Sequence, residues 1–305
     1  MRYVLFIGGR VGYEALRILA SQISISHVFL EMEHVHEQMQ YSKQISRLCR
    51  EYKIPFSTEL DDASVLETCR HLNPDYLMCF GYRRMIRKAV MACAKIACIG
   101  SHFAPLPRYR GFAPLNWVLI NGEAKTAVNI FFLADAVDAG DIIAREWVDI
   151  SDQDDINSLT DNCIRALEPT LTKALEILET GQPYGEKQDE ELATYTCSRN
   201  PEDGLIDWHQ SSQAIYNLVR ALTYPLPGAF THYNGRRMYV WKCRIEDEVN
   251  YEGRVCGKII AINKAENAIK VLTGDGSIWI TQSSTSPDNP LENEIEFGSI
   301  RVTLR

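Results

Sequence analysis

A regular succession of short apolar strands and amphipathic helices over residues 2–101 most constrains how this chain can fold. Four runs have the length and β-branched content of strands buried on both faces of a sheet, at residues 2–9, 26–32, 76–80 and 95–101. Helical patterns separate them at residues 13–21, 44–52 and 63–72. Strands joined by helices form a parallel sheet with helices on both faces, so we expect a doubly wound α/β fold.

The strand pattern continues beyond this region. KTAVNIFFL (125–133) and DIIAREWVDI (141–150) predict two more strands. A long helix is predicted over 156–180, with one apolar face formed by Leu159, Cys163, Leu167, Leu171, Leu175 and Leu178. We expect Gly181 to end this helix and Pro169 to kink or divide it, because proline lacks a backbone N–H.

The polar segment 182–203 is typical of a linker. After it come one amphipathic helix and several short strands separated by turn residues, which together predict a small antiparallel barrel. We therefore expect a mostly parallel, doubly wound α/β domain at 1–181 and a linker at 182–203. A smaller domain, a helix plus an OB-like antiparallel β-barrel, is expected at 204–305.

Composition excludes several classes of protein. The 305 residues are 46% apolar and 24% charged, which is typical of a soluble globular protein. No apolar run approaches the roughly 18 to 20 residues of a membrane helix, and the first residues lack a signal-peptide pattern, so we expect a cytoplasmic protein. The nine cysteines are scattered without a C-x-x-C pair, which argues against a disulfide framework or a zinc site. A net charge of −8 argues against a broad nucleic-acid surface.

The stretch SHFAPLPRYRG (101–111) places a histidine where the strand 95–101 should end. In an open parallel sheet, ligands bind beyond the carboxyl ends of the strands. Histidine also exchanges protons near neutral pH, and a neighbouring carboxylate would favour its charged form. His102 is therefore a candidate catalytic residue.

Three aspartates in the loop ADAVDAGD could supply that carboxylate, and spacing alone does not choose among Asp135, Asp138 and Asp141. The alternative is purely structural: His102 ends a strand, the aspartates cap turns, and the loop with Arg108 and Arg110 is a rigid turn whose arginines remain solvated. From these residues alone the two interpretations stay open.

Two other signals are weaker. IGGRVG (7–12) followed by Glu31 partly matches a dinucleotide-binding pattern, but it lacks the first glycine of that pattern. His34 and His36 have a spacing that could bind a metal from one strand face, yet no cysteine or carboxylate cluster completes such a site nearby. We expect no metal site, and an exposed loop at these histidines.

Three long motifs carry a resemblance to a known family. FGYRRMI (80–86), HFAPLPRYRGFAPLNWVLINGE (102–123) with VDAGD (137–141), and DWHQSSQAIYNLVRALTYPLPGAF (207–230) occur in this order. Together they closely resemble the folate-dependent formyltransferase family. APLNWVLINGE is most similar to the sugar-modifying branch, such as the domain that formylates nucleotide-linked aminoarabinose.

The resemblance implies transfer of a formyl group from 10-formyltetrahydrofolate to a primary amine. It assigns proton handling at the tetrahedral intermediate to His102, and to Asp138 the carboxylate that supports it. It places the folate beside Arg84, Met85, Ile86, Ala134, Asp135, Ala136 and Val137, largely through backbone contacts. Arg108 or Arg110 could contact the phosphates of a nucleotide-linked sugar.

One position departs from the family pattern Asn-x-His, because Gly100 stands in place of the asparagine that donates to the developing oxyanion. Loss of one such donor typically costs about 100- to 1,000-fold in rate. Ser101 points to the opposite face of an extended strand, so it does not replace the donor. A weak or inactive homologue that binds folate or a nucleotide sugar is therefore the alternative to an enzyme.

The acceptor is a second open choice. The branch that formylates methionyl-tRNA carries a basic insertion in its first domain, whereas LEMEHVHEQMQYSKQ (30–44) is acidic to neutral here. We therefore expect a nucleotide-linked amino sugar as the acceptor, with methionyl-tRNA as the alternative. We expect no nucleic-acid or membrane partner. A homodimer through the small barrel is one arrangement open to an enzyme of this size.

Overall fold

The computed structural model describes residues 1–305 except 34–38, 182, 247–250 and 293–294. The described chain divides into two compact units. The first comprises Met1–Gly111, Lys125–Asp149 and Asp161–Tyr195, and the second comprises Phe112–Ala124, Ile150–Thr160 and Thr196–Arg305. This division differs from the expected ranges, because two segments before residue 181 belong to the second unit and most of the expected linker belongs to the first.

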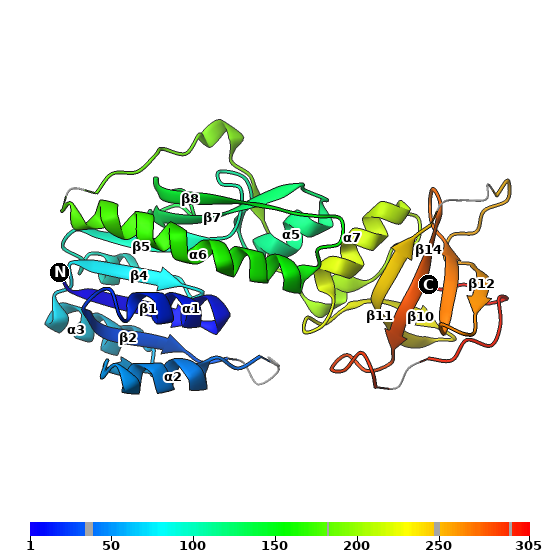
Figure 1. Cartoon of the computed structure of the whole chain (residues 1–305), viewed down its shortest axis with the longest axis horizontal. Coiled ribbons are helices and arrows are strands. Elements are labelled where there is room, and N and C mark those ends of the chain that lie inside the picture. The colour runs from blue at the N-terminus through cyan, green and yellow to red at the C-terminus, as the bar shows by residue number, and fades with distance from the viewer. Residues whose placement is uncertain (34–38, 182, 247–250, 293–294) are drawn as a thin grey trace. The chain divides into compact units, whose positions relative to one another are not determined.

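A seven-stranded sheet forms the centre of the first unit, in the order β3-β2-β1-β4-β5-β7-β8 (Figure 1). Its strands are β1 (Tyr3–Gly8), β2 (Ile25–Glu31), β3 (Phe56–Ser57), β4 (Tyr76–Phe80), β5 (Ala97–His102), β7 (Lys125–Phe132) and β8 (Ile142–Asp149). The first five strands are parallel to one another, as the strand–helix alternation predicts. β7 is antiparallel to both of its neighbours, so the sheet is mostly parallel.

Helices cover both faces of this sheet. They are α1 (Gly9–Leu19), α2 (Ser42–Glu51), α3 (Asp62–Leu72), α4 (Lys88–Met91) and α6 (Ile156–Glu179). The expected apolar face of α6 is confirmed, because all six of its predicted residues are buried. The helix continues through Pro169, so Pro169 does not divide it, and the kink that was the other expectation stays a prediction. One missing backbone N–H is not enough to break a long helix whose apolar face is packed on a sheet.

Short elements follow β5 and α6, and most of them were not predicted. They are β6 (Arg110–Gly111), α5 (Pro114–Ile120), the 3-10 helices at Glu190–Leu192 and Pro201–Gly204, and β9 (Tyr195–Thr196). β6 pairs with β9 in a two-stranded sheet. This pairing holds the loop after β5 against a segment that the sequence indicated as a linker.

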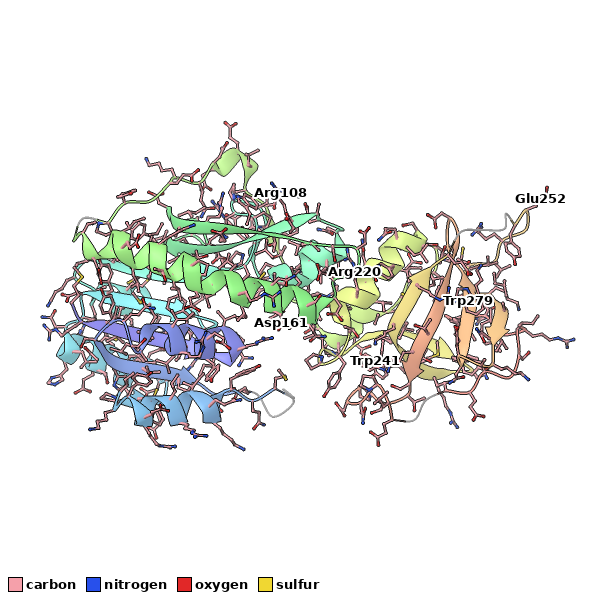
Figure 2. All side chains as sticks on the ribbon, viewed as in Figure 1. Arg108, Asp161, Arg220, Trp241, Glu252 and Trp279 are labelled. Carbon is pink, nitrogen blue, oxygen red and sulfur yellow. The ribbon has the colours of Figure 1, made fainter. Side chains whose placement is uncertain are left out.

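The second unit contains α7 (Ser212–Leu222) and an antiparallel five-stranded sheet in the order β10-β11-β14-β13-β12 (Figure 1). Its strands are β10 (Ala229–Tyr233), β11 (Arg236–Ile245), β12 (Ile259–Asn263), β13 (Ala268–Leu272) and β14 (Ser277–Ser284). Trp241, labelled in Figure 2, lies on β11 and is 1% exposed in the core of this sheet. Residues 302–305 bond to Ile259 on one side and His232 on the other, so they bridge the two edge strands.

Among the described residues, no helix is long and apolar enough to cross a membrane.

Candidate active site

His102 is the last residue of β5, and its side chain is 8% exposed. Its ring nitrogen Nε2 lies 2.7 Å from the carbonyl oxygen of Tyr109. A carbonyl oxygen only accepts hydrogen bonds, so Nε2 must donate, and the neutral ring carries its proton there. Nδ1 is then the nitrogen that can take up a proton, and it faces Asp138 Oδ2 at 3.5 Å.

Tyr109 is held in a conformation that presents its carbonyl to the histidine. Its φ of 61° lies in the left-handed region, which costs a non-glycine residue about 1 to 3 kcal/mol. The backbone N–H of Tyr109 donates to Thr194 Oγ1 at 3.0 Å, and the next N–H, of Arg110, donates to the Thr194 carbonyl at 2.9 Å. These bonds to Thr194 offset the strain and fix the tautomer of His102.

Asp138 is the aspartate that the structure brings to the histidine. It lies in the loop between β7 and β8, also in the left-handed region with a φ of 52°, and its Oδ2 accepts the N–H of Gly111 at 2.8 Å. Asp135 is turned instead to Lys88, with which it forms an ion pair of 2.8 Å. The tertiary structure thus makes the choice among the aspartates that the spacing left open.

The histidine and the aspartate form a unit that can accept and hold one proton. Protonation at Nδ1 produces an imidazolium whose Nδ1–H faces a carboxylate and whose Nε2–H remains bonded to a carbonyl. The pair can therefore take up a proton that a reaction releases, with the imidazolium beside a carboxylate.

The residues expected at the folate lie on two exposed segments. Arg84 and Met85 are exposed, Ile86 is half-buried, and residues 134–137 are all exposed. The ion pair of Lys88 with Asp135 joins the two segments. Met85 is 79% and Val137 43% exposed, so each segment offers apolar area as well as backbone groups to a flat, partly aromatic ligand.

Gly100 lies on the same strand face as His102. A Cβ at position 100 would lie 2.9 Å from Leu133 Cδ2, so a leucine methyl occupies the space that the asparagine of the family would enter. Asn129 lies opposite His102 in the sheet. Its Nδ2 donates to the carbonyls of His102 and Ala104, at 2.9 and 2.6 Å, so this asparagine does not serve as the replacement donor.

The two arginines differ. Arg108, labelled in Figure 2, is exposed, and its guanidinium lies 5.2 Å from the centroid of the Tyr109 ring. Arg110 is fully buried, so the alternative in which both arginines remain solvated is wrong. Its guanidinium forms a two-pronged ion pair with Glu190 and bonds to Gln188 and Tyr195. Pairing of β6 with β9 removes it from solvent and commits it to internal contacts.

Glu31, a weaker candidate from the sequence, is held by structural contacts, and burial makes the thiol of Cys79 unreactive. Glu31 accepts the backbone N–H of Arg83 at 2.8 Å and pairs with its side chain. Cys79 lies beside Gly100 in the sheet, and burial, with a smaller contribution from Glu31 and Asp138, raises the pKa of its thiol to about 12. It is therefore a neutral thiol and not a nucleophile. His34 and His36 lie outside the described residues, within which no cluster could hold a metal ion.

Several contacts of this site were missed from the sequence. Tyr109, Gln188 and Thr194 contribute through backbone groups or from a distant segment, and no local pattern marks such roles. Asn129 does have a signal, because it is the only polar residue in the run AVNIFFLA (127–134). A buried polar side chain in an apolar strand must find partners, and those partners are the carbonyls of His102, at the end of β5, and of Ala104 just beyond it.

The loop that carries Asp138 should tolerate no side chain at Gly140. A Cβ there would overlap the carbonyl oxygen of Phe132, which is backbone and cannot move aside. We expect Gly140→Ala to lower the melting temperature and to reduce the free energy of unfolding by about 3 kcal/mol or more, since backbone overlap exceeds an ordinary overpacking cost of about 1 to 3 kcal/mol. Gly253→Ala is the control, because nothing lies within 4 Å of its Cβ. Equal melting temperatures for the two variants would contradict this geometry.

Most of the chain matches two protein-family models. Residues 19–175 match the family model for formyl transferases, and residues 199–293 match the model for the formyl transferase C-terminal domain. A methionyl-tRNA formyltransferase of Fusobacterium nucleatum is 34% identical over 242 residues, which cover 79% of this chain and 76% of that protein.

Solved structures share the fold at low identity. An N-formyltransferase from Helicobacter canadensis, in complex with folinic acid and dTDP-3-aminofucose, superposes with a TM-score of 0.72 and 16% identity, over 92% of this chain and 99% of that one. HypX from Aquifex aeolicus gives a TM-score of 0.63 and 20% identity over 93% of this chain. The match spans 44% of HypX, less than half of its length.

Proposed function

The chain belongs to the folate-dependent formyltransferase family, and on that premise we propose that it transfers a formyl group from 10-formyltetrahydrofolate to the amine of a nucleotide-linked amino sugar. The observation that carries the proposal is the pairing of His102 Nδ1 with Asp138 Oδ2, beside two exposed segments suited to a folate.

The pair suits this chemistry. Attack of an amine on the formyl carbon creates an ammonium and an oxyanion, and the ammonium must lose a proton before the folate nitrogen leaves. His102 Nδ1 takes that proton while Asp138 stabilises the resulting imidazolium. The imidazolium then returns the proton to the folate nitrogen as the bond between that nitrogen and the formyl carbon breaks and the oxyanion re-forms the carbonyl. Nε2 stays bonded to the Tyr109 carbonyl throughout, so the ring keeps its orientation.

The negative charge of the protein favours an amino sugar over a tRNA as the acceptor. The net charge of −8 and the acidic to neutral stretch at 30–44 give little attraction for the backbone of a tRNA. Arg108 is exposed beside the catalytic loop, and we propose it as the contact for the phosphates of a nucleotide sugar. Arg110 is not proposed for this role, because its guanidinium is committed to Glu190 and Gln188.

Methionyl-tRNA is the second candidate acceptor, because the relative from Fusobacterium nucleatum, named for that activity, is 34% identical to this chain. The activity in that name is an activity of the relative, and for this chain it is a second proposal. The two acceptors differ in how their binding depends on salt. Phosphate contacts along a nucleic acid release counterions, so its affinity falls steeply with salt, whereas a sugar diphosphate makes few such contacts.

We expect the protein to formylate nucleotide-linked amino sugars and to leave charged initiator tRNA unmodified. The measurement is formyl transfer from 10-formyltetrahydrofolate to a panel of nucleotide amino sugars and to methionyl-tRNA, each at low and moderate salt. Arg108→Ala should raise KM for the sugar about tenfold or more, since a charged hydrogen bond contributes about 1.5 to 3 kcal/mol. Efficient formylation of methionyl-tRNA with a steep salt dependence would overturn the proposed acceptor.

A further inference from the structure

Asn129 holds the backbone at the end of β5, where His102 lies. It is fully buried in β7, and its Nδ2 donates to the carbonyl of His102 at 2.9 Å and to that of Ala104 at 2.6 Å. Its Oδ1 accepts from Arg145 Nε at 2.8 Å, and Nη2 of the same arginine donates to the Leu106 carbonyl at 2.7 Å. Hydrogen bonds from Asn129 and Arg145 thereby fix the carbonyls of His102, Ala104 and Leu106.

Gln188 holds the backbone at the aspartate in a similar way. Its Nε2 donates to the carbonyls of Asp138 and Gly140, both at 2.7 Å. Its Oε1 accepts from Arg110, whose Nε and Nη2 lie at 3.2 and 3.0 Å. Arg110 is in turn fixed by the carboxylate of Glu190.

The two arrangements share one design. In each, the nitrogen of a side-chain amide donates to two carbonyls that lie two residues apart, and the oxygen of the same amide accepts a hydrogen bond from an arginine. One of the two carbonyls is that of His102 in the first arrangement and that of Asp138 in the second. We infer that Asn129 and Gln188 are positioning residues that set the contact between His102 and Asp138, an inference that rests on the proposed function.

The location of the amides supports a role beyond stability. The chain leaves the sheet after His102, so the Ala104 carbonyl lies beyond the strand, where it accepts from Asn129 Nδ2 and from the backbone N–H of Leu106 at 2.8 Å. Asp138 sits in a left-handed conformation, and Gln188 donates to its carbonyl and to that of Gly140 in the same loop. Release of either backbone would move an ionisable side chain relative to its partner. A displacement of about 1 Å at reacting groups can cost about 100-fold in rate.

The test compares Asn129→Val with Asn129→Thr, which match in shape and differ in one hydrogen-bond donor. We expect kcat to fall about 100-fold in the valine variant and about tenfold in the threonine variant, with KM for 10-formyltetrahydrofolate nearly unchanged. Ring-nitrogen NMR of isotope-labelled histidine gives a readout that does not need turnover. His102 should carry its neutral proton on Nε2 in the wild type and as a mixture of tautomers in the valine variant.

Asn217→Val is the matched control. Asn217 is a buried asparagine of the second unit whose Oδ1 accepts from Arg220 Nε at 3.0 Å, so its loss should lower stability and leave kcat and the His102 spectrum unchanged. Gln188→Met tests the other amide at a half-buried position, should Asn129→Val fail to fold. We expect about a 100-fold fall in kcat there as well.

The outcomes separate the two proposals. If folded Asn129→Val and Gln188→Met keep the wild-type kcat and the wild-type His102 spectrum, the positioning role is wrong. If the wild type transfers no formyl group to any acceptor but the His102 tautomer still changes in these variants, the positioning role stands and the proposed function fails.

Discussion

Replacement of His102 by alanine should reduce formyl transfer by about 100- to 10,000-fold, the range typical for loss of a positioned acid–base group. The ring contacts both the Asp138 carboxylate and the Tyr109 carbonyl, so its loss removes the group proposed to take the proton. Affinity for a folate analogue should change little, because the expected folate segments lie on other loops. Single-turnover transfer and analogue binding measure the two quantities separately.

His27→Ala controls for the general cost of removing a buried histidine. His27 is 9% exposed in β2 of the same sheet, and its Nε2 is hydrogen-bonded to Ser57 Oγ at 2.9 Å, so it resembles His102 in burial and bonding. We expect both variants to lose stability and only His102→Ala to lose turnover. Asp138→Asn keeps the shape of the loop and removes the charge, so its rate should fall less. Wild-type rates in both His102→Ala and Asp138→Asn would show that the catalytic site lies elsewhere.

Restoring an asparagine at position 100 should raise the rate of transfer, most clearly when Leu133 is shortened at the same time. An oxyanion donor is typically worth about 2.7 to 4 kcal/mol at the transition state, or about 100- to 1,000-fold. In Gly100→Asn alone the new Cβ meets Leu133 Cδ2 at 2.9 Å, so part of that gain is lost in displacing a leucine. Gly100→Asn/Leu133→Ala provides the space and should show the larger increase.

Two further variants isolate the donor from the packing change. Gly100→Ala adds the Cβ without the amide, and Leu133→Ala opens the space without adding a group, so neither should accelerate the reaction. A tenfold or larger increase confined to the asparagine variants would show that the wild-type site lacks a donor. A decrease from an already fast wild type would show instead that another group supplies it, and that the new side chain displaces the reacting atoms.

The overall fold could be predicted because its signals are local. Each buried strand of the parallel sheet needs an apolar run, and each covering helix needs an apolar face, so the periodicity places β4 at its observed residues and the apolar face of α6 residue by residue. The same reasoning predicted a strand at 95–101, and β5 (Ala97–His102) ends one residue later. The antiparallel direction of β7 did not, because an apolar run has no direction in a sheet.

The sequence by itself predicted the alternating strands and helices of the first part of the chain and the antiparallel strands of the second. It also pointed to His102 as a candidate catalytic residue and, through its motifs, to the family. Spacing left three aspartates open, the resemblance pointed to Asp138, and the tertiary structure shows its carboxylate facing His102. Only the tertiary structure decided that Arg110 is buried and that Gln188 reaches the backbone of Asp138. These contacts join residues far apart in the chain, through left-handed backbone at Tyr109 and Asp138 and through pairing of β6 with β9. Such contacts depend on the packing of several segments at once, and no periodicity within one segment records them.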